Sequence, residues 1–219
     1  MRRGATLVLA LPPWVDVVFR VVLAGGLVVA ALIPALSMAW VRSPLARGVG
    51  DAITQPVPFD HRHHVRDDGI DCLYCHVDAE RGPVAGVPDT RLCMGCHGQI
   101  WNESPELARV RASFETRRPI RWERVTAIAD FVFFDHSAHV AHGVGCETCH
   151  GRVDLMPAVW RAESMTMSFC IDCHRDPDPQ LRPQAQITTM GIAPDRARGE
   201  RIADQLHIAA PTDCTGCHR

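Results

Sequence analysis

Five short stretches of the chain share one spacing of two cysteines and a histidine, Cys-x-x-Cys-His. They occupy residues 72–76, 93–97, 146–150, 170–174 and 214–218. In this spacing the two thiols can each bond to a vinyl group of one haem, and the adjacent histidine then reaches the iron as an axial ligand. The motif therefore predicts covalently attached haem c, five per chain.

The residues of these motifs have two predicted roles. The thiols that would attach haem are Cys72, Cys75, Cys93, Cys96, Cys146, Cys149, Cys170, Cys173, Cys214 and Cys217. The proximal iron ligands would be His76, His97, His150, His174 and His218. Zinc sites and redox dithiols also use Cys-x-x-Cys pairs, but neither needs a histidine directly after the second cysteine. All ten cysteines lie in the motifs, which leaves none for a disulfide framework.

A second repeated phrase, F-D-H-x-x-H-V, precedes the first and the third haem motif. It begins at Phe59 and again at Phe134. Histidines three residues apart lie on nearly the same face of a helix, so each phrase can offer ligands to two different haems. The predicted distal ligands are His61, His64, His136 and His139.

The repeat also distinguishes these histidines from their neighbours. His64 aligns with His139, so the adjacent His63 is interpreted as a surface residue or as a neighbour of the ligands. His142 has no counterpart in the first phrase and is interpreted as an exposed loop residue.

Four distal ligands leave one of the five irons without a distal ligand. The candidates are Met167, three residues before Cys170, and His207, with Met156 and Met165 less favoured. A thioether ligand would raise the reduction potential of its haem relative to two histidines. Met167 is preferred because it lies beside an attachment site, and His207 stays open.

The composition fits a haem-rich chain. The 219 residues carry a net charge of −2 with 22% charged residues, which gives no indication of nucleic-acid binding. Sixteen glycines and sixteen prolines predict many turns. Burial of the haem faces would supply much of the apolar core. The expected fold class is a multihaem cytochrome c, mostly irregular, with short α-helices packed around haems and one N-terminal transmembrane α-helix.

That N-terminal helix is predicted at residues 21–41, a stretch without any charge. About 20 apolar residues span the hydrocarbon core of a bilayer, and Trp14 and Trp40 lie near the two ends, where interfacial aromatics are favoured. A cleavable signal peptide is the alternative, because Ser37-Met-Ala39 resembles a cleavage site. The apolar run is longer than a usual signal core, so a retained anchor in the bacterial cytoplasmic membrane is predicted. Residues 5–19 are expected along the cytoplasmic interface.

The expected organisation follows the motifs. It comprises an anchor at 1–47, a linker at 48–58, a dihaem module at 59–100, a connecting helix and basic segment at 101–133, a second dihaem module at 134–176, and a C-terminal arm with the fifth haem at 177–219. Within the connection, Ser104 and Pro105 indicate the start of a helix that ends at about Glu115. Residues 176–213 are expected to be irregular and to lie across the surface or against another subunit.

Together, the anchor, the five motifs and the paired histidine phrases resemble the pentahaem cytochrome subunit of bacterial alternative complex III. Local strings at Phe131–His139 and Met167–Arg175 carry the resemblance in detail. It implies an electron-transfer subunit of a quinol-oxidising membrane complex, with no catalytic site of its own. Its partners would be polytopic quinol-binding subunits, an iron–sulfur protein, and a periplasmic cytochrome c or blue-copper (cupredoxin) acceptor.

Haem c is attached on the outer side of the cytoplasmic membrane, so the haem region is expected on the periplasmic side. Two other functions stay open. One is a membrane-anchored quinol dehydrogenase cytochrome that serves a single soluble partner. The other is a multihaem enzyme with one open iron, although no motif has lysine in place of its histidine.

Overall fold

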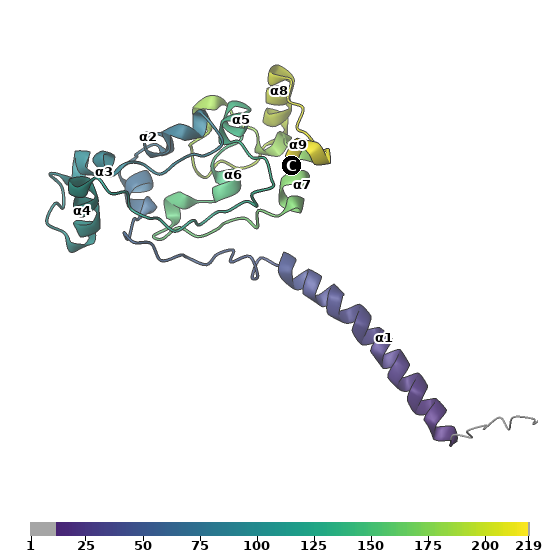
Figure 1. The fold of residues 1–219 in the computed structure, drawn as a ribbon. Coiled ribbons are helices and arrows are strands. Elements are labelled where there is room, and N and C mark those ends of the chain that lie inside the picture. Colours follow the sequence, from purple (N-terminus) through teal and green to yellow (C-terminus); the bar gives the residue numbers. More distant parts are fainter. Residues whose placement is uncertain (1–11, 219) are drawn as a thin grey trace, which may run out of the picture. The chain divides into compact units, whose positions relative to one another are not determined.

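The computed structural model describes residues 12–218, and the chain divides after Arg47 into two compact units. The first unit consists mainly of one long helix, and the second carries all five Cys-x-x-Cys-His motifs (Figure 1).

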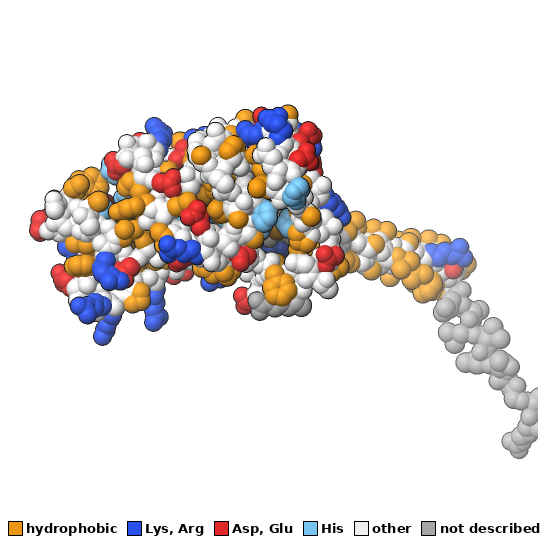
Figure 2. All heavy atoms as spheres, turned by 90° about the horizontal axis from the view of Figure 1, so that it is seen from above, with side chains coloured by type: hydrophobic (Ala, Val, Ile, Leu, Met, Phe, Trp, Pro, Cys, Tyr) orange, Lys and Arg blue, Asp and Glu red, His pale blue; other side chains and the backbone are white. Residues whose placement is uncertain are grey.

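Helix α1 spans Pro13–Arg42, and the predicted apolar stretch 21–41 lies within it. Proline at its first position fits a helix start, because that residue has no intrahelical use for an N–H group. None of its residues is buried, and hydrophobic side chains cover it (Figure 2). Within the described residues, it is the one helix long and apolar enough to cross a membrane.

The start of α1 lies earlier than predicted. Asp16, which lies in the stretch 5–19 that was expected along the membrane interface, forms an ion pair of 3.0 Å with Arg20 on the exposed first turns of the helix. Residues 5–11 of that stretch lie outside the described residues.

The second unit contains short helices joined by irregular segments. The α-helices are α2 (Cys72–Cys75), α3 (Thr90–His97), α4 (Ala108–Thr116), α5 (His136–Ala141), α6 (Glu147–His150), α7 (Met167–Arg175), α8 (Arg196–Leu206) and α9 (Cys214–Cys217). The 3-10 turns are η2 (Val77–Glu80), η3 (Pro105–Leu107), η4 (Val153–Leu155), η5 (Asp178–Gln180) and η6 (Gln184–Gln186), and η1 (Arg62–Asp67) is a π-helical turn. Residues 12–218 contain isolated β-bridges and no strand. The predicted mostly irregular architecture with short helices is confirmed.

Side-chain caps explain why helices as short as four residues form at the motifs. An oxygen of the residue before the helix accepts a hydrogen bond from a backbone N–H of the first turn, which satisfies one of the donors left free there. The caps are Asp71 for α2, Asp89 for α3, Asp135 for α5, Thr166 for α7 and Asp213 for α9. The cysteines of four motifs therefore lie on capped helical turns.

The protein core formed by side chains is small. Within the described residues, the buried hydrophobic side chains are Val57, Ala79, Val110, Val140, Met156, Leu181 and Ile187. So few apolar side chains cannot stabilise a unit of this size by themselves, which agrees with the expectation that cofactor faces supply much of its core.

The connecting helix lies where the sequence predicted it. Ser104 accepts a hydrogen bond from the Glu106 N–H at 3.3 Å, Pro105 opens η3, and α4 continues to Thr116. Arg117 then leaves the helix in a left-handed conformation with φ 54°.

The segment 176–213 is not irregular throughout, because it contains helix α8. Asp195 caps this helix by accepting from the Arg198 N–H at 3.1 Å. Gly199 lies so close to η5 that a Cβ there would be 1.6 Å from the Asp178 carbonyl oxygen. The segment was expected to lie on the surface or on another subunit, and in the structure α8 packs against η5 of the same unit.

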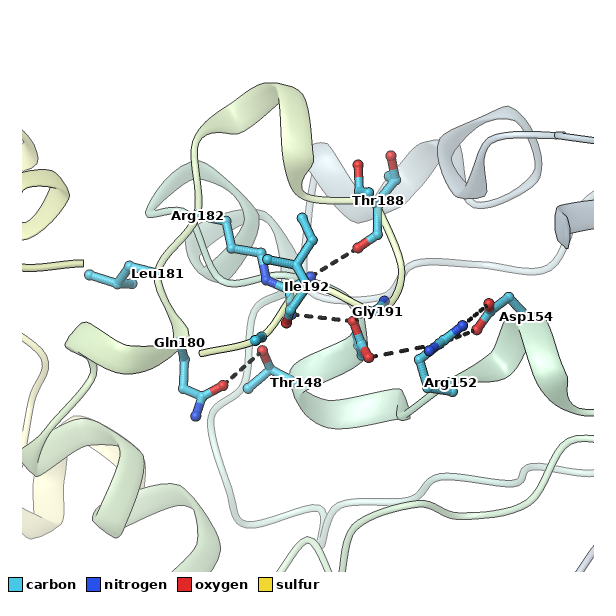
Figure 3. A network of polar contacts seen from close by, with 12 residues as sticks. Thr148, Arg152, Asp154, Gln180, Leu181, Arg182, Thr188, Gly191 and Ile192 are labelled. Carbon is cyan, nitrogen blue, oxygen red and sulfur yellow. Dashed lines mark hydrogen bonds and ion pairs between the residues drawn. The ribbon is translucent and has the colours of Figure 1, made fainter. Parts of the chain in front are cut away.

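A buried arginine connects the loop after η5 to the third haem motif (Figure 3). Arg182 is 4% exposed and donates to the carbonyl oxygens of Thr189 at 2.9 Å and Ile192 at 3.2 Å. It also donates to Glu147 Oε2 at 3.3 Å, which accepts a further bond from the Gly191 N–H at 2.8 Å. The loop 181–192 is thereby fixed against α6.

Candidate haem centres

In three pairs of histidines the two rings face each other, and the distance between the ring centroids is nearly the same in all three. Each pair joins a predicted distal ligand to the histidine of a motif. The ring centroids are 6.0 Å apart for His64 and His97, 6.2 Å for His136 and His150, and 6.1 Å for His139 and His174. Metal–imidazole bonds are about 2 Å long, as in zinc sites, so a single metal ion fits between two rings at this separation.

His61 and His76 form a fourth candidate pair. His61 Nδ1 is buried without a hydrogen-bond partner. Burial is the main reason why the pKa of His61 is lowered to about 4, and the neighbouring His76 contributes to this shift. A buried neutral imidazole is the form of histidine that binds a metal.

In six of the candidate ligand histidines, a hydrogen bond determines which ring nitrogen is left to bind a metal. In each case the ring donates its Nδ1–H to a backbone carbonyl, because a carbonyl can only accept. The bonds run from His64 to Asp60 (2.9 Å), His76 to Gly86 (2.8 Å), His97 to Ile100 (3.1 Å), His136 to Pro83 (2.7 Å), His139 to Asp135 (2.7 Å) and His174 to Pro211 (2.7 Å). This leaves the Nε2 lone pair for a metal and holds the ring in place.

All ten cysteines are free of disulfide bonds. Burial raises the pKa of the Cys149 thiol to about 12, and it also raises the pKa of Cys75, Cys93, Cys170 and Cys173. Redox dithiols have lowered pKa values, so these thiols lack the electrostatics of a thioredoxin-like site.

The donor groups fit haem better than a bare metal ion. Within residues 12–218, no three side chains among His, Cys, Asp and Glu gather in a way that could hold an ion. Facing pairs of histidines need four more ligands in the plane between them, and a porphyrin supplies those four.

Comparison with known proteins agrees with this chemistry. Residues 132–219 match the family described as cytochrome c7 and related cytochrome c. The chain is also similar to the multihaem cytochrome c subunit of menaquinone reductase from Nitratidesulfovibrio vulgaris, with 38% identity over 97 residues. That match covers 44% of this chain and 45% of the relative, so it spans less than half the length of either. The fold class is that of a multihaem cytochrome c.

A multihaem cytochrome c holds haem c, and the motifs with their facing histidines are the residues that would hold it here. When bound, haem c supplies an iron that takes up or releases one electron. The thiols of the motifs would bond the haem, and the histidines would offer ring nitrogens to its iron. Where two histidines of the chain face each other, no position is left for a substrate.

The fifth motif lacks such a facing histidine among the described residues. The His218 ring packs instead against Phe131, with ring centroids 5.8 Å apart. Met167, the favoured distal ligand, is 71% exposed at the first residue of α7. His207 is exposed at the end of α8, in a left-handed conformation with φ 51°.

The two histidines that the repeat left aside are both exposed. His63 stacks on Trp101 with ring centroids 5.7 Å apart, and it lies 3.9 Å from Asp67 and 3.8 Å from Asp68. His142 donates its Nδ1–H to the Ala138 carbonyl at 2.6 Å, as the candidate ligands do, but its ring lies at the exposed end of α5.

Two phenylalanines with no predicted role lie against candidate ligands. Phe59 stacks on His64 with ring centroids 4.3 Å apart, and Phe134 stacks on His139 at 4.8 Å. Their place at the start of each F-D-H-x-x-H-V phrase was the available signal, since the repeat includes the aromatic residue as well as the histidines.

Proposed function

We propose that this chain is a membrane-anchored cytochrome c with five haems that carries electrons between membrane-bound quinone chemistry and a periplasmic carrier. The observation that carries the proposal is the set of facing histidine pairs about 6 Å apart. Irons with both axial positions filled can exchange electrons but cannot bind substrate, so the haems at these pairs would conduct electrons rather than catalyse a reaction.

The proposed arrangement consists of two dihaem modules, 59–100 and 134–176, and a fifth haem at the C-terminus. It is supported by the way in which each F-D-H-x-x-H-V phrase turns one histidine toward each of two motifs. Residues 1–47 would anchor the chain, with the haem region on the periplasmic side, because haem c is attached there.

The proposed direction runs from quinol to a small cytochrome c or a blue-copper protein. In this reading the chain is a subunit of an assembly like alternative complex III. Polytopic subunits would oxidise quinol, and an iron–sulfur protein would pass the electrons on. Support comes from the resemblance of the motifs and from the multihaem relative, whose name links it to menaquinone.

The opposite direction is the second candidate, and one observation favours it. The relative is named a menaquinone reductase subunit, which indicates electrons flowing into the quinone. The haem ligands described above serve either direction equally, because they bind the ferric and the ferrous iron.

Purification of the full chain from its own membranes with a tag tests the proposal. We expect polytopic membrane subunits to co-purify, and we expect a quinol analogue to reduce the haems of that preparation. Oxidation of the reduced haems by a quinone analogue, without reduction by the quinol, would support the second candidate. A chain that purifies alone and reacts with neither would contradict both.

A further inference from the structure

We propose that the haems do not follow each other in space as their motifs do in the sequence. Haems I to V are named here for the motifs 72–76, 93–97, 146–150, 170–174 and 214–218. The geometry points to the spatial order II–I–III–IV–V, with haems II and V as the two terminals that exchange electrons with partners. The inference rests on the proposed electron-transfer function and deepens it.

Haems I and II are neighbours because one helical turn serves both. His64 faces His97 of motif II at 6.0 Å, and His61, the residue directly before the same π-helical turn, is near enough to His76 of motif I to interact with it electrostatically. This turn alone does not determine which of haems I and II lies nearer to the second dihaem module.

The junction between the modules shows that haem I is the nearer one. The first cysteines of motifs I and III both lie against one short segment. Cys72 Sγ is 3.8 Å from the Thr188 carbonyl oxygen, and the Cys146 N–H donates to the Ile187 carbonyl at 3.0 Å. Motifs I and III therefore meet at residues 187–188.

One loop reinforces this junction from the other side. Gly86 O accepts from the proximal His76 of haem I at 2.8 Å, and Pro83 O accepts from the distal His136 of haem III at 2.7 Å. The loop 82–86 thus orients one ligand of each haem. No comparable contact is found between motif II and motif III among the hydrogen bonds of the described residues.

The remaining order follows from α5 and from the C-terminal segment. On α5, His136 faces His150 of motif III and His139 faces His174 of motif IV. His174 in turn donates to the Pro211 carbonyl at 2.7 Å, three residues before Cys214 of motif V. Haem IV consequently lies between haems III and V.

Figure 1 shows α3, α2 and α6 in this order from one end of the unit, with α7 and α9 together at the other end. Thiol exposure agrees: Cys96 of motif II and Cys214 of motif V are exposed, and the other eight thiols are half-buried. The two exposed attachment sites are the two ends of the inferred row.

The electron balance is simple. Oxidation of one quinol releases two electrons and two protons, and the row takes the electrons one at a time, each haem changing from ferric to ferrous and back. A one-electron acceptor at the other terminal removes them. In the reverse direction, the same two terminals exchange roles. Haem II, second in the sequence, is therefore a terminal and not an interior site.

Two matched substitutions test the order in the full-length holoprotein. His64→Met and His61→Met each replace a distal ligand by a thioether, which raises the potential of one haem so that it is reduced first. Under the inferred order, selective reduction of haem II in His64→Met shifts the electron paramagnetic resonance signal of one other haem. Selective reduction of haem I in His61→Met shifts the signals of two. The reversed counts, two and one, would overturn the inference.

A measurement on the unsubstituted protein covers the case in which a variant does not fold. In the fully reduced state, nuclear Overhauser contacts between haem substituents identify neighbours directly. We expect contacts between haems I and III, and contacts between haems II and III in their place would overturn the order. Both tests use the isolated chain, so they are independent of the co-purification and quinol assays that test the proposed function.

Discussion

At the scale of single residues, the candidate ligands owe their orientation to backbone carbonyls. His64 and His139 each donate Nδ1–H to the carbonyl four residues earlier, and a phenylalanine stacks on each ring. The ring is thereby held with Nε2 outward before any metal arrives. Such preorganisation reduces the entropy that binding would otherwise cost.

The neighbouring pair His63-His64 allows a direct test of this reading. We expect His64→Ala to leave one haem per chain without its sixth ligand, so that one additional ferrous haem binds carbon monoxide. His63→Ala is the matched control and should leave carbon monoxide binding unchanged, since His63 lies at the surface against Trp101. Equal carbon monoxide binding by both variants and the parent would show that His64 is not a ligand. Optical spectra of the reduced proteins measure this.

The sequence predicts the roles of single residues well where the signal is local and repeated. The alignment of the two phrases favoured His64 over His63 because ligand spacing is a property of a single helical turn. Met167 and His207 have no such repeat, and their exposed positions in the structure were not predictable from neighbouring residues. The stacking of Phe131 on His218 joins segments more than eighty residues apart, and no local pattern encodes it.

At the scale of elements, tertiary contacts decide what local patterns leave open. Residues 196–206 contain a glycine, and irregular structure was expected in this region. The Asp195 cap and packing against η5 outweigh the helix propensity cost of Gly199, which is about 1 kcal/mol. The start of the connecting helix was predictable, because Ser104 and Pro105 give a local signal.

The close approach at Gly199 predicts a large effect of a single methyl group. We expect Gly199→Ala to force α8 away from η5 and to lower the free energy of unfolding by about 1–3 kcal/mol, as overpacking does. Gly82→Ala is the matched control, because a Cβ there would meet no atom within 4 Å. Denaturant titration of the holoprotein measures both. Equal midpoints for the two variants would contradict the packing described here.

The hydrogen bonds of the loop 181–192 predict that two arginines, Arg182 and Arg196, differ in their contribution to the free energy of unfolding. Arg182→Met removes the buried cationic partner of Glu147 and leaves it only the longer contact of 3.9 Å to the more exposed Arg152. Breaking a buried pair costs about 3–5 kcal/mol. Arg196→Ala is the control: its pair with Asp176 is exposed on both sides, and we expect no measurable change in the denaturation midpoint. Comparable losses for the two variants would argue against a structural role of the buried network.

At the scale of the whole molecule, the small side-chain core and the number of motifs belong together. Seven buried hydrophobic side chains are few for the described residues, and covalently held porphyrins would supply the missing apolar surface. The order of the haems also belongs to this scale. Motifs I and III meet at residues 187–188 although they are more than seventy residues apart in the sequence, so motif spacing alone could not reveal the order.

The haem content is therefore a prediction about the whole chain. We expect the intact mass of the mature protein to exceed that of the polypeptide by five haem groups, because each of the five motifs offers two thiols without a disulfide. Denaturing mass spectrometry retains covalent haem and measures the number. Cys214→Ala/Cys217→Ala is a suitable control and should reduce the count by one. A parent protein with four haems would remove one site from the inferred row.

The last prediction concerns helix α1, which either anchors the mature chain or is removed as a signal. We expect retention, because an apolar helix of 30 residues exceeds the length that spans a bilayer. The protein should stay in the membrane fraction after a high-salt wash, and its intact mass should include residues 13–42. A matched variant, Leu27→Arg, places a charge in the middle of the helix at a cost of about 2.5–3.5 kcal/mol, and should weaken membrane insertion. A soluble mature chain that begins after Ala39 would instead identify α1 as a cleaved signal, and the haem unit would then need a partner to hold it at the membrane.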